Sequence, residues 1–230
     1  AKSYAKNGLA VAFDDIFTYT RASSATFTNR RLKKNGGYEY FLDNDYVGDV
    51  ENLVTYSEDF TDSDWSKTST TITANAITAP NGTSSADKIT DTSTSGIHNL
   101  ANAPTGNPSG KAYTFSCYIK SGSLSAARLN FATSSGNFVS MSLNLITGEN
   151  NITTGGDYSN AYGSAKHIFN GWWLAQITAT VGADVAWGAI YGSQIRTESP
   201  YLTQVYAGSG KTLYIWGAQL TESAKPLPYV

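Results

Sequence analysis

Apolar and polar residues alternate along several stretches of the chain. Between residues 113 and 120, Tyr113, Phe115, Cys117 and Ile119 are separated by Thr, Ser and Tyr, a period of two that is typical of a half-buried strand. The same alternation recurs at 128–131, 139–145, 173–181 and 213–220, and clusters of Gly, Pro, Asn and Ser lie between these runs. No ten-residue stretch has a helical period. The pattern predicts an all-β fold, and the number and spacing of the strands favour a sandwich.

The first 51 residues have a different pattern. Their apolar residues form short strand-like pieces, at 9–13, 17–19 and 38–41, broken by Asp and Gly-rich sequence. These pieces hold too few apolar residues to fold alone. We therefore predict two parts: residues 1–51 as an N-terminal attachment or leader arm, and residues 52–230 as the main β domain.

Composition narrows the function. Charged residues make up only 15% of the chain and its net charge is -2, so Ser, Thr, Asn and Gly supply most of the polar surface. Such a surface suits an extracellular or virion protein and hydrogen bonding to neutral sugars. No basic stripe is present, which argues against nucleic acid as a partner. No stretch approaches 18 apolar residues, so no membrane insertion is expected. A single cysteine excludes disulfides within the chain.

The sequence offers little for catalysis. Neither histidine, His98 or His167, has a recognisable nucleophile beside it, and each is interpreted as a surface or loop residue. Glycoside hydrolysis needs two facing carboxylates, and the obvious acidic residues are confined to one short stretch: Glu58, Asp59, Asp62 and Asp64. This stretch is read first as a solvated turn and second as a structural calcium site with oxygen ligands. We expect a non-enzymatic protein that requires no cofactor, with calcium as the one possible ion.

Sugar binding remains as a function that the polar and aromatic residues favour. Sugars stack their C–H faces on aromatic rings, while amides and charged groups bond their hydroxyls. If the alternating strands share one sheet, their outward residues share one exposed face. The predicted ligand-binding residues on that face are Tyr118, Arg128, Asn130, Asn144, Trp172 and Gln176, with Lys120 beside them. The alternative is that either Trp172 or its neighbour Trp173 fills the core.

Five blocks of the sequence, in order, carry a family resemblance. They are Asn52–Phe60 with Trp65, Ala79–Ile89, Tyr113–Lys120, the Asn-Gly-Trp-Trp run at 170–173, and Trp216–Leu220 with Pro228-Tyr229. Residues 52–229 thereby resemble carbohydrate-binding-module-like domains of bacteriophage tail fibre and tailspike proteins. Residues 17–27 look like the short leader that precedes such domains, here abbreviated. Within these blocks, Trp216, Ala218 and Leu220 are expected to form one buried face, and Asn170-Gly171 a tight hairpin turn.

The resemblance implies a jelly-roll sandwich on the virion surface, in a tail fibre, tailspike or head fibre. It implies binding to host cell-surface polysaccharide, contacts with other virion proteins through the N-terminal arm, and a homotrimer. The alternative is a structural decoration or fibre-assembly protein with the same fold and no sugar binding. A depolymerase is disfavoured because the long β-helical repeats of such enzymes are missing.

Overall fold

The structure is a computed structural model of residues 1–230. It describes the backbone of residues 4–6, 9–11, 20–21, 25–27, 30–32, 38–40, 50–104, 110–132, 138–182, 187–195, 202–203 and 205–230, and the side chains of residues 51–104, 110–132, 138–182 and 206–230. The chain divides into two compact units, residues 1–52 with Val230, and residues 53–229. Each unit is described by itself.

Residues 1–52 contain short antiparallel strands. A two-stranded sheet joins β1 (Tyr4–Lys6) to β2 (Leu9–Val11). A three-stranded sheet has the order β3 (Thr20–Arg21), β4 (Ala25–Phe27) and β7 (Val50–Glu51). A third sheet pairs β5 (Arg30–Leu32) with β6 (Tyr38–Tyr40). The side chains of residues 1–50 lie outside the described residues, so the attachment role predicted for residues 1–51 stays a prediction.

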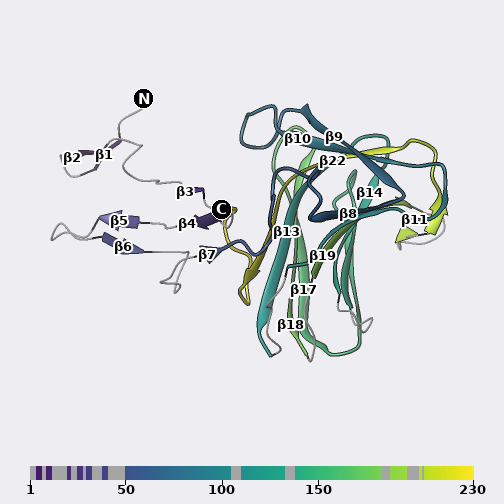
Figure 1. The fold of residues 1–230 in the computed structure, drawn as a ribbon. Coiled ribbons are helices and arrows are strands. Elements are labelled where there is room, and N and C mark those ends of the chain that lie inside the picture. The colour runs from purple at the N-terminus through teal and green to yellow at the C-terminus, as the bar shows by residue number, and fades with distance from the viewer. Residues whose placement is uncertain are drawn as a thin grey trace. The chain divides into compact units, whose positions relative to one another are not determined.

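The larger unit consists mainly of two antiparallel sheets (Figure 1). The six-stranded sheet has the order β17 (Tyr158–His167), β18 (Trp172–Val181), β13 (Ala112–Ser121), β22 (Thr212–Glu222), β10 (Ala86–Asp91) and β9 (Thr70–Ile77). The seven-stranded sheet has the order β16 (Asn150–Gly155), β15 (Phe138–Asn144), β14 (Ala126–Ala132), β19 (Trp187–Ile195), β12 (Asn99–Asn102) and β8 (Trp65–Thr68), and β20 (Leu202–Thr203) pairs with β19. A small separate sheet pairs β11 (Ser95–Ile97) with β21 (Val205–Ala207).

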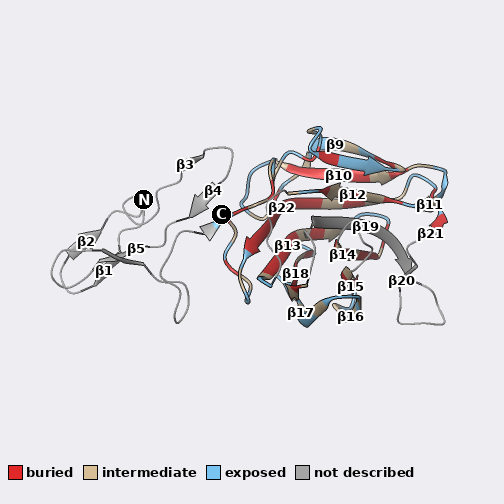
Figure 2. Ribbon diagram, turned by 60° about the horizontal axis from the view of Figure 1, so that its bottom comes forward, coloured by how far each residue is buried: buried red, intermediate tan, exposed pale blue. Residues whose placement is uncertain are grey.

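The main core lies between the two large sheets. From the six-stranded sheet it takes the inward residues of β13, β18 and β22, and from the seven-stranded sheet those of β14 and β15. Figure 2 shows these strands mainly in the colour of buried residues. Tyr113, Phe115, Cys117 and Ile119 are at most 1% exposed, as their alternation predicts. The all-β prediction is therefore confirmed and the fold is consistent with a β-sandwich, whereas the jelly-roll topology stays a prediction.

A β-bulge in β22 changes the side to which one tryptophan points. Along β13 and β22, Ser116 is opposite Gln219 and Tyr118 is opposite Trp216, so β22 has one extra residue between these pairs. Gly217 has a φ of +60°, the left-handed conformation that glycine adopts in such bulges. Ala218 and Leu220 belong to the main core, but Trp216 belongs to a second cluster. The prediction of one buried face for these three residues is therefore wrong.

This second cluster lies on the outer face of the six-stranded sheet. Its buried members are Ala79, Ala86, Trp172 and Trp216, and Ile77, Tyr118, Ile168, Tyr214 and Tyr229 pack against it. Tyr118 and Trp216 have ring centroids 5.3 Å apart, and Tyr229 lies 4.8 Å from Trp216. Part of the outer face of this sheet thus carries a buried apolar cluster.

Candidate functional site

The predicted glycan-binding residues do not share one face. Tyr118 and Lys120 lie on β13, and Trp172 and Gln176 lie on β18, on the outer face of the six-stranded sheet. Arg128, Asn130 and Asn144 lie on β14 and β15, on the outer face of the seven-stranded sheet. The premise of a single platform is therefore wrong, because β13 and β14 follow one another in the chain but belong to opposite layers of the sandwich.

Trp172 is not available as an exposed platform. Its side chain is 1% exposed and packs in the second cluster, while Trp173 is half-buried on the other face of β18. The Trp173 indole Nε1 donates to the Leu145 carbonyl oxygen at 2.9 Å, and its ring lies against the turn at Gly148. The sequence does not indicate which of the two tryptophans is exposed, and in the structure both are largely buried.

The turn between Trp172 and the preceding strand has the expected geometry. Asn170 and Gly171 have φ values of +50° and +78°, and Trp172 N donates to the Phe169 carbonyl oxygen at 2.9 Å. Two central residues with positive φ define the type I′ turn that Asn-Gly favours. The hairpin turn predicted here is confirmed.

Tyr118 and Gln176 have partners within the protein. Burial, followed by the neighbouring Cys117 thiol group, raises the pKa of the Tyr118 phenol, consistent with its packing against Trp216 and Tyr229. Gln176 is half-buried, and its Oε1 accepts a hydrogen bond from Ser164 Oγ at 3.5 Å. Both side chains are therefore held by contacts with neighbouring residues of the protein.

Polar residues line up on the outer face of the seven-stranded sheet. The antiparallel register places Arg128 opposite Ser142, and Ser142 opposite Asn151 on the next strand. A second row, one pair further along, joins Asn130, Ser140 and Thr153 in the same way. Directly opposite side chains in a sheet have Cβ atoms about 5 Å apart. We call the six residues of these two rows the polar sheet face.

Hydrogen bonds within the polar sheet face fix its central side chains. Ser140 Oγ donates to Asn130 Oδ1 at 2.5 Å, and Arg128 Nε donates to Ser142 Oγ at 3.3 Å. Asn130, Ser140 and Ser142 are 4%, 1% and 5% exposed. These polar side chains are shielded from water although they lie on the outer side of the sheet. Their hydrogen bonds are therefore stronger than those on an ordinary solvated surface, because the local dielectric constant is lower.

The Asn144 side chain bonds to the turn that follows β15. Its Oδ1 accepts hydrogen bonds from Ile146 N at 2.9 Å and from Thr147 N at 3.2 Å. The side chain therefore caps the turn that leads to β16, as Asn does when its amide oxygen bonds to backbone two residues on. Sequence reasoning missed Ser140, Ser142, Asn151 and Thr153, although the alternation with Met141 and Leu143 already places the two serines on the same face as Asn144.

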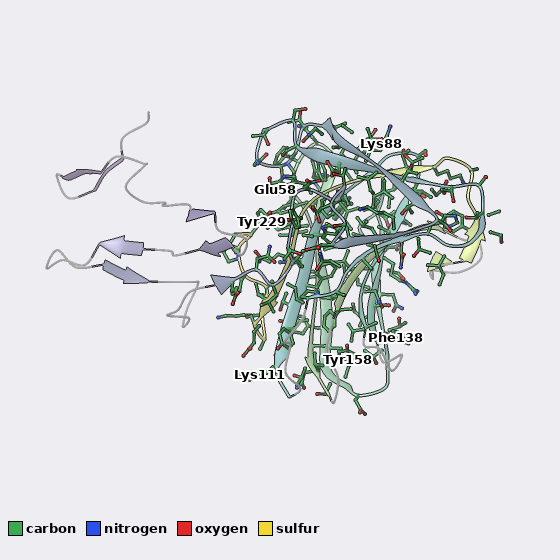
Figure 3. The ribbon with its side chains drawn as sticks, in the orientation of Figure 1. Glu58, Lys88, Lys111, Phe138, Tyr158 and Tyr229 are labelled. Atoms are coloured by element: carbon green, nitrogen blue, oxygen red, sulfur yellow. The ribbon has the colours of Figure 1, made fainter. Side chains whose placement is uncertain are left out.

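The four acidic residues of the predicted calcium site do not converge. Asp59 Oδ1 accepts bonds from Thr61 N and Thr61 Oγ1, and Asp62 Oδ1 accepts one from Asp64 N. Asp64 Oδ2 accepts from Thr55, and Glu58 Oε1 accepts from Tyr229 Oη (Figure 3). Among the residues that the structure describes, no three His, Cys, Asp or Glu side chains gather as a metal site would require. Each of these carboxylates thus has a protein partner, within the turn for Asp59 and Asp62 and outside it for Asp64 and Glu58, and calcium binding stays a prediction.

His98 is buried, not at the surface. It is 0% exposed, its Nε2 lies 3.2 Å from the Thr92 carbonyl oxygen, and its ring lies 4.5 Å from that of Tyr206. Tyr206 Oη donates to Asp91 Oδ2 at 2.9 Å, and Asp91 Oδ1 accepts from Ser209 N and Lys211 N. Burial, followed by Asp91, raises the pKa of the Tyr206 phenol. These contacts hold the loop that precedes β22. His98 itself lies in the connection between β11 and β12, so the loop alternative is confirmed, whereas the surface alternative is wrong because the side chain is buried.

The fold and the polar sheet face thus define a β-sandwich protein with a hydroxyl- and amide-lined sheet surface. No protein-family model matches the chain, and no curated protein matches it. The structure resembles the enzymatically active domain of tailspike protein 4 from Bacteriophage CBA120, with 10% identity, a TM-score of 0.41, and coverage of 74% of this chain and 21% of that one. It also resembles the CBM22-1–GH10 modules of xylanase 10B from Clostridium thermocellum, with 13% identity, a TM-score of 0.42, and coverage of 77% and 29%.

The chain spans less than a third of the length of either structure. Likeness at this level does not carry a function from those proteins to this one. No helix in the described part of the chain is long and apolar enough to cross a membrane.

Proposed function

We propose that residues 53–229 form a non-catalytic carbohydrate-recognition domain that binds host cell-surface polysaccharide on the surface of a phage particle. The observation that carries the proposal is the polar sheet face, where Arg128 and Asn130 stand in two rows of hydroxyl and amide side chains across β14, β15 and β16. The resemblance of residues 52–229 to modules of phage fibres and tailspikes supports the virion setting.

The chemistry of the polar sheet face suits neutral sugars. Vicinal sugar hydroxyls both donate and accept hydrogen bonds, and the half-buried Asn151 and Thr153 side chains also do both. Arg128 adds donors in a planar fork. Asn130, Ser140 and Ser142 are too well buried to contact a ligand themselves. Ser142 instead holds the half-buried Arg128 through its Nε, so Arg128 has less side-chain entropy to lose when a ligand binds.

Recognition without hydrolysis fits the same surface. Cleavage of a glycosidic bond needs two carboxyl groups on either side of it. The side chains that the structure describes on this face, from β16 across to β8, include no Asp or Glu. The proposal therefore assigns binding and no reaction to this face.

The test is a binding titration of the full chain with polysaccharide prepared from candidate host cells. Arg128→Gln and Asn151→Ala are expected to lower the affinity at least about tenfold, since each removes a direct hydrogen-bonding group. Gln176→Ala, a half-buried amide on the opposite sheet, is the matched control and should bind as the wild type does. Equal effects of all three substitutions, with melting temperatures unchanged, would exclude the polar sheet face as the binding surface.

The second candidate function is structural, as a virion decoration or fibre-assembly domain. It is favoured by the internal pairing of Asn130 with Ser140 and of Arg128 with Ser142, which engages these side chains without a ligand. Absence of binding by the folded wild-type chain to any host polysaccharide would select it.

Both candidate functions include contacts through the N-terminal arm and a trimeric assembly. We propose that residues 1–51 contact other virion proteins and that three chains associate. Light scattering on the full chain is expected to give the mass of three chains. A stable monomer of 24.6 kDa at micromolar concentration would refute the trimer and leave the glycan-binding proposal standing.

A further inference from the structure

Lysine and aromatic residues alternate across the outer face of the six-stranded sheet. The register places Lys88 of β10 opposite Tyr214 of β22, and Tyr214 opposite Lys120 of β13. Lys120 is in turn opposite Trp172 of β18. One row across four strands therefore reads Lys, Tyr, Lys, Trp. With strands about 4.8 Å apart, the two lysines start about 10 Å from each other on either side of the tyrosine ring.

Both lysines lack a counter-charge in the described structure. Neither Lys88 nor Lys120 makes an ion pair or hydrogen bond there, whereas Lys111, which immediately precedes the strand of Lys120, pairs with Glu222 at 2.6 Å. Asp87, next to Lys88 in the chain, is buried and accepts bonds from Phe60 N and Asn75 N. Two unpaired ammonium groups that flank one ring leave a local positive charge in a chain whose net charge is -2.

Packing against the sheet and the second cluster constrains the side chains of this row. Lys88, Tyr214 and Lys120 are all half-buried, so each side chain is partly constrained by its surroundings. Trp172 fills the end of the row at 1% exposure, and Tyr214 packs against the cluster that holds Trp172 and Trp216. The aliphatic part of Lys120 lies beside the turn at Gly171, within 3.6 Å of where a Cβ on that glycine would be. Lysines often keep their methylene groups on apolar surface in this way while the charged end stays in water.

We propose that the row of Lys88, Tyr214 and Lys120 binds an acidic polysaccharide. The exposed part of the Tyr214 ring contacts the C–H face of one sugar, and the two lysines bind acid groups carried by that sugar and its neighbours. A nucleic acid also offers rings and negative charge, but its binding needs an extended basic track to displace counterions, and this row has two lysines. The site lies on the opposite sheet from the polar sheet face, so it stands whether or not that face binds neutral sugars.

The experiment titrates the full chain with oligogalacturonate at low salt, by calorimetry. The Lys88→Gln/Lys120→Gln double variant is expected to bind at least about tenfold more weakly, because both charge-assisted contacts are lost. Tyr214→Ala should also weaken binding. Lys111→Gln is the control for one of the two removed charges, since it removes a single ammonium group just before the distant end of β13. Figure 3 places Lys88 and Lys111 at opposite ends of the domain. Its affinity should stay within about twofold of the wild type.

The ligand controls separate charge from ring recognition. The same oligomer with its carboxyl groups methyl-esterified is expected not to bind, and raising the salt concentration should weaken binding of the acidic form. The proposal is overturned if the folded wild type does not bind oligogalacturonate. It is also overturned if Lys111→Gln weakens binding as much as the double variant does, or if oligothymidylate binds more tightly than oligogalacturonate. A loss of oligogalacturonate binding in Arg128→Gln as large as that of the double variant would assign the acidic sugar to the polar sheet face and would also overturn the proposal.

Discussion

Replacement of Trp172 by alanine should unfold the domain more readily without revealing a sugar site. The indole is 1% exposed and packs with Trp216, Ala79 and Ala86. A buried aromatic residue removes about 150–250 Å² from water, which at about 25 cal/mol per Å² corresponds to roughly 4–6 kcal/mol as an upper bound. Substitutions of this kind in cores cost about 3–5 kcal/mol, and we expect Trp172→Ala to lose that amount of unfolding free energy.

The assay is guanidinium unfolding at equilibrium, with thermal unfolding beside it. For a domain of this size, about 1 kcal/mol lowers the melting temperature by about 2–4 °C, so a fall of roughly 6–20 °C is expected. If Trp172→Ala does not fold at all, Trp172→Phe keeps part of the ring and should lose about 1–2 kcal/mol. Gln176→Ala, on the same face of the same strand, should lose less than about 1 kcal/mol. A loss below about 1 kcal/mol for Trp172→Ala, together with weaker sugar binding, would refute the burial of this ring.

Three further predictions concern single buried or strained positions. Burial raises the pKa of the Asp87 carboxyl above its ordinary value. Its protonated form therefore stabilises the fold below that ordinary value, and this stabilisation is lost as the pH rises through the folded-state pKa. The unfolding free energy of the wild type relative to Asp87→Asn should decrease over that pH range, and an increase would contradict a raised pKa. Gly148→Ala should cost about 1–3 kcal/mol because the new Cβ would lie 2.4 Å from the Trp173 ring, whereas Gly210→Ala, with a similar φ and open space around it, should cost about 1 kcal/mol in the same unfolding assay. Cys117 is buried and its thiol pKa is raised by that burial, so a thiol reagent should label it only after denaturation, and rapid labelling of the native chain would show that the strand opens.

The alternation of residue types predicted the strands at 113–120, 128–131, 139–145, 173–181 and 213–220, and the inward faces of the first four. It places Met141 and Leu143 in the core and Ser140 and Ser142 outside it, as the structure has them. Alternation does not indicate which sheet a strand joins, because a strand looks the same in either layer of a sandwich. The candidate site was therefore assembled from two faces that point away from each other.

The position of Trp216 shows a second limit of period-two reasoning. A β-bulge adds one residue to a strand and moves every later side chain to the other face relative to the partner strand. Here Gly217, at a φ of +60°, is the added residue. The glycine is visible in the sequence, but glycine also occurs in strands without a bulge. Only the pairing of β22 with β13 shows that Trp216 leaves the core and joins Trp172 outside it.

The C-terminal segment covers part of the outer face of the six-stranded sheet. Thr114 Oγ1 donates to the Ser223 carbonyl oxygen at 3.0 Å, and Gln219 Nε2 donates to the Pro228 carbonyl oxygen at 3.0 Å. Tyr229 then packs on Trp216. Residues 223–229 thus lie along this face and supply hydrogen-bond partners to Thr114 and Gln219. The segment reaches the face from β22 and packs beside Trp216, whereas Lys88 and Lys120 keep no protein partner in the described structure. The same sheet face therefore has one part that the chain itself covers and one part whose charges remain available to a ligand, and Figure 3 shows Tyr229 and Lys88 at separate positions on the domain.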